Sequence, residues 1–148
     1  MATVFDLADW FLHKQKMTHK KLQKLYYYAQ AWSYAICPEP ISDAVFQAWV
    51  HGPVCYPLYA KYKDYGFGYI PQREEKPSVF SADENDFLEG IWSTYGDISA
   101  NALEALSHTE PPWQIARFGL DSDTHSQNEI APKDMADYYR SIYTGGDA

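Results

Sequence analysis

Two pairs of residues combine the side-chain types that carry acid–base or nucleophilic chemistry. His51 is followed four residues later by Cys55, and His108 two residues later by Glu110. A histidine beside a thiol is typical of a nucleophilic dyad or a metal-ligand pair, and one beside a carboxyl group is typical of acid–base catalysis. A Gly-Pro step interrupts the first pair, so the two side chains do not share one regular helix. We expect a buried structural Cys55, a turn histidine at 51, and a His108 that hydrogen-bonds the backbone near a helix end.

The sequence signatures of the common enzyme classes are missing. The chain contains no Gly-rich phosphate loop, no C-x-x-C, no H-E-x-x-H and no G-x-S-x-G. None of the five histidines pairs with another residue at clear metal-ligand spacing. A small hydrolase is therefore a minor alternative. We expect no enzymatic activity, no metal and no cofactor.

A group of lysines occupies the start of a long helix that is expected to begin after Thr18 and run to about Ile36. Lys20 and Lys21 lie in its first turn and Lys24 one turn later. Helix N-termini favour negative charge, so these cations do not stabilise the helix. Two explanations stay open: acidic residues elsewhere in the fold neutralise the lysines, or the lysines contact a partner.

Three consecutive tyrosines in the same helix raise a packing question, because neighbouring side chains point about 100° apart. Tyr26 belongs to an apolar stripe with Leu22, Leu25 and Ala29. The other two tyrosines lie off that stripe. Either the helix is central and covered on all sides, or it has a second aromatic face for a partner. The candidate partner-binding residues are Lys20, Lys21, Lys24, Tyr27 and Tyr28.

Capping residues and apolar periodicity predict a mainly α, single compact helical domain over residues 1–148. Ser81 with Glu84 forms a capping box, a signature of a helix start. The remaining helices are expected after Thr3, Thr18 and Ser99, near Pro57, from "EPPW" to Ala116, and from Pro132 to about Tyr143.

A small two-stranded β-ribbon interrupts the helices. A strand is expected over Val45–Val50, followed by a Gly-Pro turn, and "FGYIP" at 67–71 is its expected partner. The polar segment 119–131 is expected to be a flexible loop and the tail 144–148 to fray.

Composition and charge narrow the class of protein. The chain has 148 residues, a net charge of -8, 13 tyrosines and five tryptophans. The negative charge disfavours general binding to nucleic acid or anionic membranes, so a DNA-binding regulator is a minor alternative. Tyr and Trp are enriched at protein interfaces. Two cysteines, no signal peptide and no long apolar run indicate a cytoplasmic protein with reduced thiols.

Three phrases together carry a family resemblance: "MTHKKLQKLYYYAQAW" at 17–32, "FQAWVHGPVCYPLYAKYKDYG" at 46–66 and "ALSHTEPPWQIAR" at 105–117. With them the chain resembles the Panacea domain family, the SocA- or GepA-like, phage-associated antitoxins, from about residue 4 to residue 117. Family members often have leucine where this chain has Tyr26, and often another residue at Ser33.

The resemblance implies an antitoxin of a bacterial or prophage toxin–antitoxin pair, which neutralises a cognate protein toxin by direct contact. Toxins of the family include small alarmone-synthetase-like enzymes that block translation. One branch of the family instead acts as a protease adaptor that delivers the toxin for degradation. A homo-oligomer is left open. The family-motif residues, expected to be structural, are Trp49, His51, Gly52, Pro53, Pro57, His108, Glu110, Pro112 and Trp113.

Overall fold

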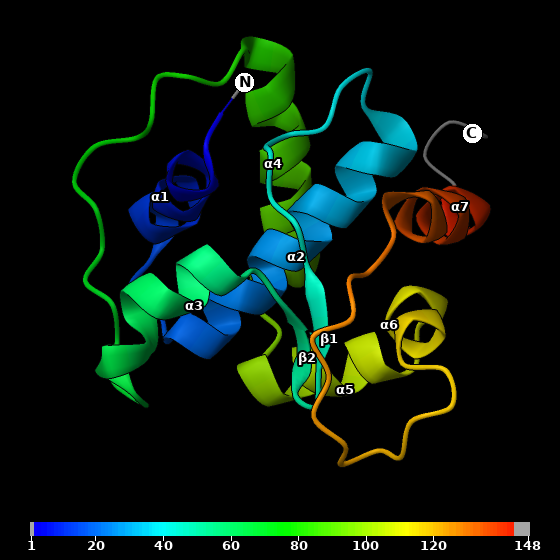
Figure 1. The fold of residues 1–148 in the computed structure, drawn as a ribbon. Helices are drawn as coiled ribbons and strands as arrows, with labels where there is room; N and C mark the ends of the chain where they lie inside the picture. The colour runs from blue at the N-terminus through cyan, green and yellow to red at the C-terminus, as the bar shows by residue number, and fades with distance from the viewer. Residues whose placement is uncertain (1, 144–148) are drawn as a thin grey trace.

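The structure is a computed structural model that describes residues 2–143, and this part of the chain folds into seven α-helices, one 3-10 helix and one two-stranded hairpin. The helix α2 (His19–Ile36) runs through the middle of the molecule (Figure 1). The other helices are α1 (Val4–Lys14), α3 (Tyr56–Tyr62), η1 (Lys63–Tyr65), α4 (Ala82–Tyr95), α5 (Ala100–His108), α6 (Pro111–Ala116) and α7 (Pro132–Ile142). This architecture confirms the predicted fold class. Within residues 2–143, every helix is too short or too polar to cross a membrane.

The helix starts predicted from capping residues are confirmed. Thr3 accepts a hydrogen bond from Asp6 N, and Ser81 accepts one from Glu84 N; each acidic side chain bonds back to its cap. Thr18 accepts from the third residue of α2. These side chains satisfy backbone donors that a helix leaves free at its start, so they fix where each helix begins.

The central helix α2 is covered on all sides. Every residue of 22–31 is buried. Helix α7 lies along one side of α2, while α1, α3, α4, α5 and the hairpin cover the remainder. The sequence left two explanations for the tyrosines outside the main apolar stripe: a central, covered helix or an aromatic face for a partner. The structure shows the central, covered helix.

The ribbon is a tight hairpin formed by β1 (Gln47–Trp49) and β2 (Gly52–Val54). Its strands are antiparallel, with Gln47 opposite Val54 and Trp49 opposite Gly52. The predicted pairing of the first strand with residues 67–71 is therefore wrong. The predicted Gly-Pro turn is wrong as well, because Val50 and His51 form the turn and Gly52 and Pro53 belong to β2. Instead, Ile70 N donates to Met17 O at 2.8 Å, next to the start of α2. The two-residue turn brings the "GPV" segment back onto the strand before any distant segment can pair with it.

The segment 119–131 contains no helix, as expected, but its last part is attached to the hairpin. Ala48 N donates to Asn128 O, and Ile130 N donates to Phe46 O, both at 2.8 Å. The buried Arg117 donates to Ala48 O at 3.0 Å and to Thr124 O at 2.6 Å. Mobility of this segment stays a prediction. The predicted frayed tail, 144–148, lies outside the described residues.

Candidate functional site

The second strand of the hairpin opens on a glycine that no other residue can replace without strain. Gly52 has φ +110°, which L side chains rarely adopt. A Cβ atom at this position would lie 2.9 Å from Lys24 Cε and 3.0 Å from Ser107 Oγ. The missing side chain allows the start of β2 to pack directly onto α2 and α5, so this contact joins all three motif phrases.

Lys24, the side chain beneath this part of the hairpin, is a buried amine. It is 2 % exposed, and its Nζ donates to Pro53 O at 3.3 Å. Burial lowers the pKa of Lys24 to about 7; the carboxylate of Glu104 opposes this shift, and the charge of Lys20 adds to it. Removing an ammonium group from water favours its neutral form.

The other two lysines are neutralised or bonded within the fold. Lys20 forms an ion pair with Glu104 on α5 at 2.5 Å. The other oxygen of that carboxylate lies 3.2 Å from His51 Nδ1 in the hairpin turn. Lys21 Nζ donates to Gly96 O, at the end of α4, at 2.6 Å. The first explanation for the lysine group, internal neutralisation, therefore holds for Lys20, and Lys21 caps another helix.

The "EPPW" phrase ties α6 to the hairpin. Trp113 Nε1 donates to Trp49 O at 2.8 Å. The indole of Trp113 stacks on the His108 ring, with ring centroids 4.1 Å apart. Burial lowers the pKa of His108, which favours the neutral ring. Pro112 lies in the first turn of α6, and Pro57 takes the same place in α3, where proline is tolerated.

A carboxyl group one helical turn further along α2 from Lys24 organises the tyrosines. Glu110 is 5 % exposed, and its Oε1 accepts from Tyr28 OH at 2.7 Å and Tyr139 OH at 2.9 Å. Burial raises the pKa of Glu110, while the two hydroxyl donors lower it. Tyr139 OH also bonds Tyr27 OH at 3.3 Å, and the Tyr28 ring stacks on Tyr95 with centroids 4.2 Å apart. We call Tyr27, Tyr28, Glu110 and Tyr139 the tyrosine–glutamate cluster.

Three of the five candidate partner-binding residues lie where a partner cannot touch them in this conformation. Tyr27 and Tyr28 are 1 % and 0 % exposed and belong to the tyrosine–glutamate cluster, and Lys24 lies under the hairpin. The prediction that these three side chains form a binding face is corrected by their burial. Lys20 and Lys21 are half-buried, and a role for them in partner binding stays a prediction.

The geometry thus joins the three motif phrases into one unit: the start of α2, the hairpin and the α5–α6 corner. A family model described as "Antitoxin SocA-like, Panacea domain" matches residues 22–114, which span this unit. The chain belongs to this family. The Panacea domain is also similar to the Antitoxin SocA of Caulobacter vibrioides (strain NA1000 / CB15N), with 28% identity over 131 residues, 80% of this chain and 70% of the relative. No solved structure matches it.

In this Panacea domain, the two members of each candidate catalytic pair lie in different surroundings. The His51 side chain is 78% exposed, whereas Cys55 is fully buried and burial raises its pKa to about 11. A thiol with a raised pKa is a poor nucleophile at neutral pH. Glu110 bonds two tyrosine hydroxyls, while His108 stacks on an indole. No group of three potential metal ligands is present among residues 2–143.

Sequence reasoning missed three contributors to the Panacea domain. Glu104 gathers Lys20 and His51, Tyr139 completes the tyrosine–glutamate cluster, and Arg117 holds the segment after α6 against the hairpin. Each acts across a long stretch of chain, so no local spacing marks it. The neighbouring carboxylates Glu74 and Glu75 are visible in the sequence but belong to none of the motif phrases.

Proposed function

We propose that this chain is an antitoxin that neutralises a cognate protein toxin by binding it directly. The observation that carries the proposal is the match of the "Antitoxin SocA-like, Panacea domain" model to residues 22–114, where the hairpin and the α5–α6 corner form one packed unit. The similarity to a relative named Antitoxin SocA supports the same role. The toxin class that we expect is a small enzyme that blocks translation.

The surface is suited to a binding protein more than to an enzyme. Several bulky apolar side chains are exposed, including Phe67 at 101% and Phe118 at 91%. Aromatic side chains of this kind anchor protein interfaces. The buried groups Lys24, Glu110 and Tyr139, by contrast, are hydrogen-bonded internally. A neutralising complex of ordinary stability buries about 1,600 Å² in total, which this surface can supply.

Co-expression tests the proposal. The chain is produced together with the product of the neighbouring gene, and growth and co-purification are measured. We expect growth arrest by the neighbour alone, rescue by the chain, and a complex that survives gel filtration. A harmless neighbour, or rescue without any complex, would contradict direct neutralisation. Rescue that disappears in a host lacking its ATP-dependent protease would instead identify a protease adaptor.

A further inference from the structure

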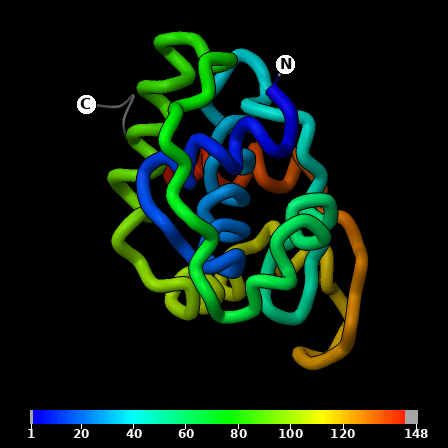
Figure 2. Tube along the Cα trace, turned by 90° about the vertical axis from the view of Figure 1, so that its left-hand side faces the viewer, coloured from blue at the N-terminus to red at the C-terminus, as the bar shows by residue number. Residues whose placement is uncertain are grey.

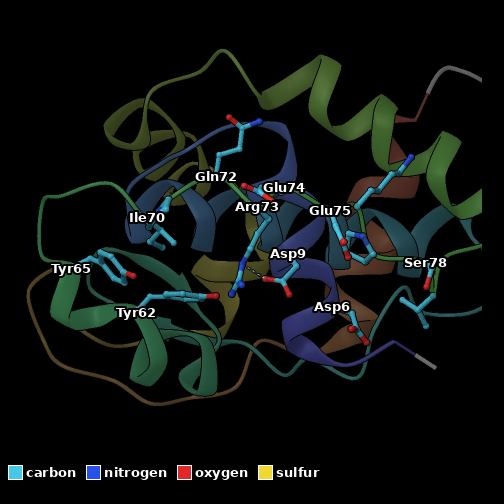
Figure 3. Close-up of a pocket in the computed structure, with 14 residues that line it drawn as sticks. Asp6, Asp9, Tyr62, Tyr65, Ile70, Gln72, Arg73, Glu74, Glu75 and Ser78 are labelled. Atoms are coloured by element: carbon cyan, nitrogen blue, oxygen red, sulfur yellow. Dashed lines mark ion pairs between the residues drawn. The ribbon is translucent and has the colours of Figure 1, made fainter.

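A groove of about 800 Å³ lies on the side of the molecule away from the α5–α6 corner. Its walls come from α1, from the α3–η1 corner and from the segment 70–79, which crosses the outside of α1 (Figures 2 and 3). The volume falls within the range of ligand and peptide sites. Of its lining residues, Tyr62 and Tyr65 belong to the second motif phrase.

The floor of the groove is held in place by the end of α1. Arg73 N donates to Leu12 O at 2.9 Å, and Gln72 Nε2 donates to His13 O at 2.9 Å. The Arg73 guanidinium pairs with Asp9 at 3.2 Å inside the groove (Figure 3). The first part of the 70–79 segment is therefore positioned before any partner arrives, which lowers the entropic cost of binding.

Polar groups without partners face this floor. Tyr62 is 3 % exposed, and its buried hydroxyl lies beside the Arg73 guanidinium in Figure 3, where it raises the pKa of Arg73 but forms no well-aligned hydrogen bond within residues 2–143. A buried hydroxyl without a partner costs free energy, so an incoming donor or acceptor is favoured there. Glu74 and Glu75 line the same groove, are exposed, and form no ion pair within the described residues.

The charge that remains unpaired in the groove is negative. The positive charge of Arg73 is already matched by Asp9, and the Lys76 ammonium lies over the Trp10 ring, 5.9 Å from its centroid. The carboxylates of Glu74 and Glu75 remain exposed to solvent. A cationic partner gains from this arrangement, and the chain's net charge of -8 adds attraction at long range.

One end of the groove is aromatic. Tyr65 lines it and is 44% exposed, and the turn that follows carries Phe67 at 101% and Tyr69 at 60%. Exposed aromatic rings bury apolar side chains and also attract guanidinium and ammonium groups through their faces. The groove thus offers carboxylates along its length and aromatic anchors at one end.

We propose that this groove binds a segment of a protein partner that carries Lys or Arg next to bulky apolar side chains. On the antitoxin proposal, that segment belongs to the toxin. The basic residues meet Glu74 and Glu75, the apolar residues pack against the aromatic end, and a polar group of the partner satisfies the Tyr62 hydroxyl. A second copy of this chain is the competing occupant and is separated by the test.

The first experiment measures the groove without the toxin. Fluorescence anisotropy follows binding of a labelled (Lys-Leu-Lys-Trp)3 peptide and of its (Glu-Leu-Glu-Trp)3 counterpart. We expect binding of the basic peptide, weakened about tenfold or more by the double change Glu74→Lys and Glu75→Lys. The matched control, Asp121→Lys with Asp123→Lys, makes the same charge change in the segment after α6 and should weaken binding less than about twofold. Equal losses in both variants would overturn the groove as the site.

The second experiment uses the neighbouring gene's product, with circular dichroism to verify that each variant is folded. Loss of the complex in the Glu74→Lys, Glu75→Lys variant and in Phe67→Ser, but not in the control, supports the groove as the toxin surface. A complex unchanged in these variants refutes it while the antitoxin proposal stands. If the unaltered chain forms no complex, the antitoxin proposal fails, and the peptide result alone decides the groove. A dimer in gel filtration that these changes dissociate would assign the groove to a second copy and overturn the proposal.

Discussion

The buried ammonium group of Lys24 should cost the fold stability, and its removal should restore it. Lys24→Met keeps an unbranched side chain of similar length beneath the hairpin, so the packing against Gly52 is retained. It removes the one polar atom that burial penalises and leaves Pro53 O without this donor. The outcome depends on which of these two effects is larger.

The lowered pKa of Lys24 gives the size of the desolvation penalty. Lowering it from 10.5 to about 7 corresponds to about 5 kcal/mol of lost stability at pH 7, at about 1.4 kcal/mol per pH unit. A carbonyl that loses its donor costs about 1–3 kcal/mol. The desolvation effect is larger, so Lys24→Met should raise the free energy of unfolding at pH 7 by roughly 2–4 kcal/mol.

The same shift predicts a pH dependence with a definite sign. Between pH 7 and pH 9 the unfolded chain binds the lysine proton and the folded chain releases it, so stability rises with pH by up to about 1.4 kcal/mol per unit. Lys24→Met removes this slope. Urea unfolding followed by tryptophan fluorescence at several pH values measures both quantities. Parallel pH profiles for the two proteins, or a less stable variant at pH 7, would refute the assignment of Lys24 as a desolvated cation.

Three further changes test the packing around the motif phrases. Gly52→Ala should lower the free energy of unfolding by about 2–4 kcal/mol, because of backbone strain and the close contact with α2. Gly119 also has a positive φ but has open space around it, so Gly119→Ala should lower it by about 1 kcal/mol. Equal losses in thermal or urea unfolding would argue against the close contact at Gly52. Glu110→Ala should lower the free energy of unfolding by about 3–5 kcal/mol, because it leaves buried tyrosine hydroxyls unpaired. Glu110→Gln keeps an acceptor oxygen and should lower it less. The reverse order in urea unfolding would contradict the role of Glu110 in the tyrosine–glutamate cluster. Lys20→Glu should cost about 1 kcal/mol or less at low salt, because it faces Glu104, and the loss should shrink at high salt; a salt-independent loss would rule out a charge effect.

Local signals in the sequence located the helices well. The capping boxes at Thr3 and Ser81, the caps at Thr18 and Ser99, and the prolines that open α6 and α7 each act within one helical turn, so the chain near them is sufficient to predict the start. The helix ends were found equally well where proline or glycine follows.

Features that depend on tertiary packing were not predictable in the same way. The strand partner was missed because a short hairpin and a distant pairing have the same apolar pattern. The burial of Lys24 was missed because a lysine in the first turns of a helix is usually solvated, and only the hairpin folded over it makes it an interior residue. The groove exists because the segment 70–79 passes outside α1, and the periodicity of apolar residues does not predict the path of such a segment.

The enclosure of residues 22–31 in α2 also determines where this protein is free to change during evolution. Each side chain of 22–31 is buried, several hold specific bonds to other elements, and most replacements there would lower stability before they altered any surface. The segments 66–79 and 118–127 carry most of their side chains outside the interior. Adaptation to a different partner is therefore expected to accumulate in these outer segments, while the tyrosine helix preserves the fold that presents them.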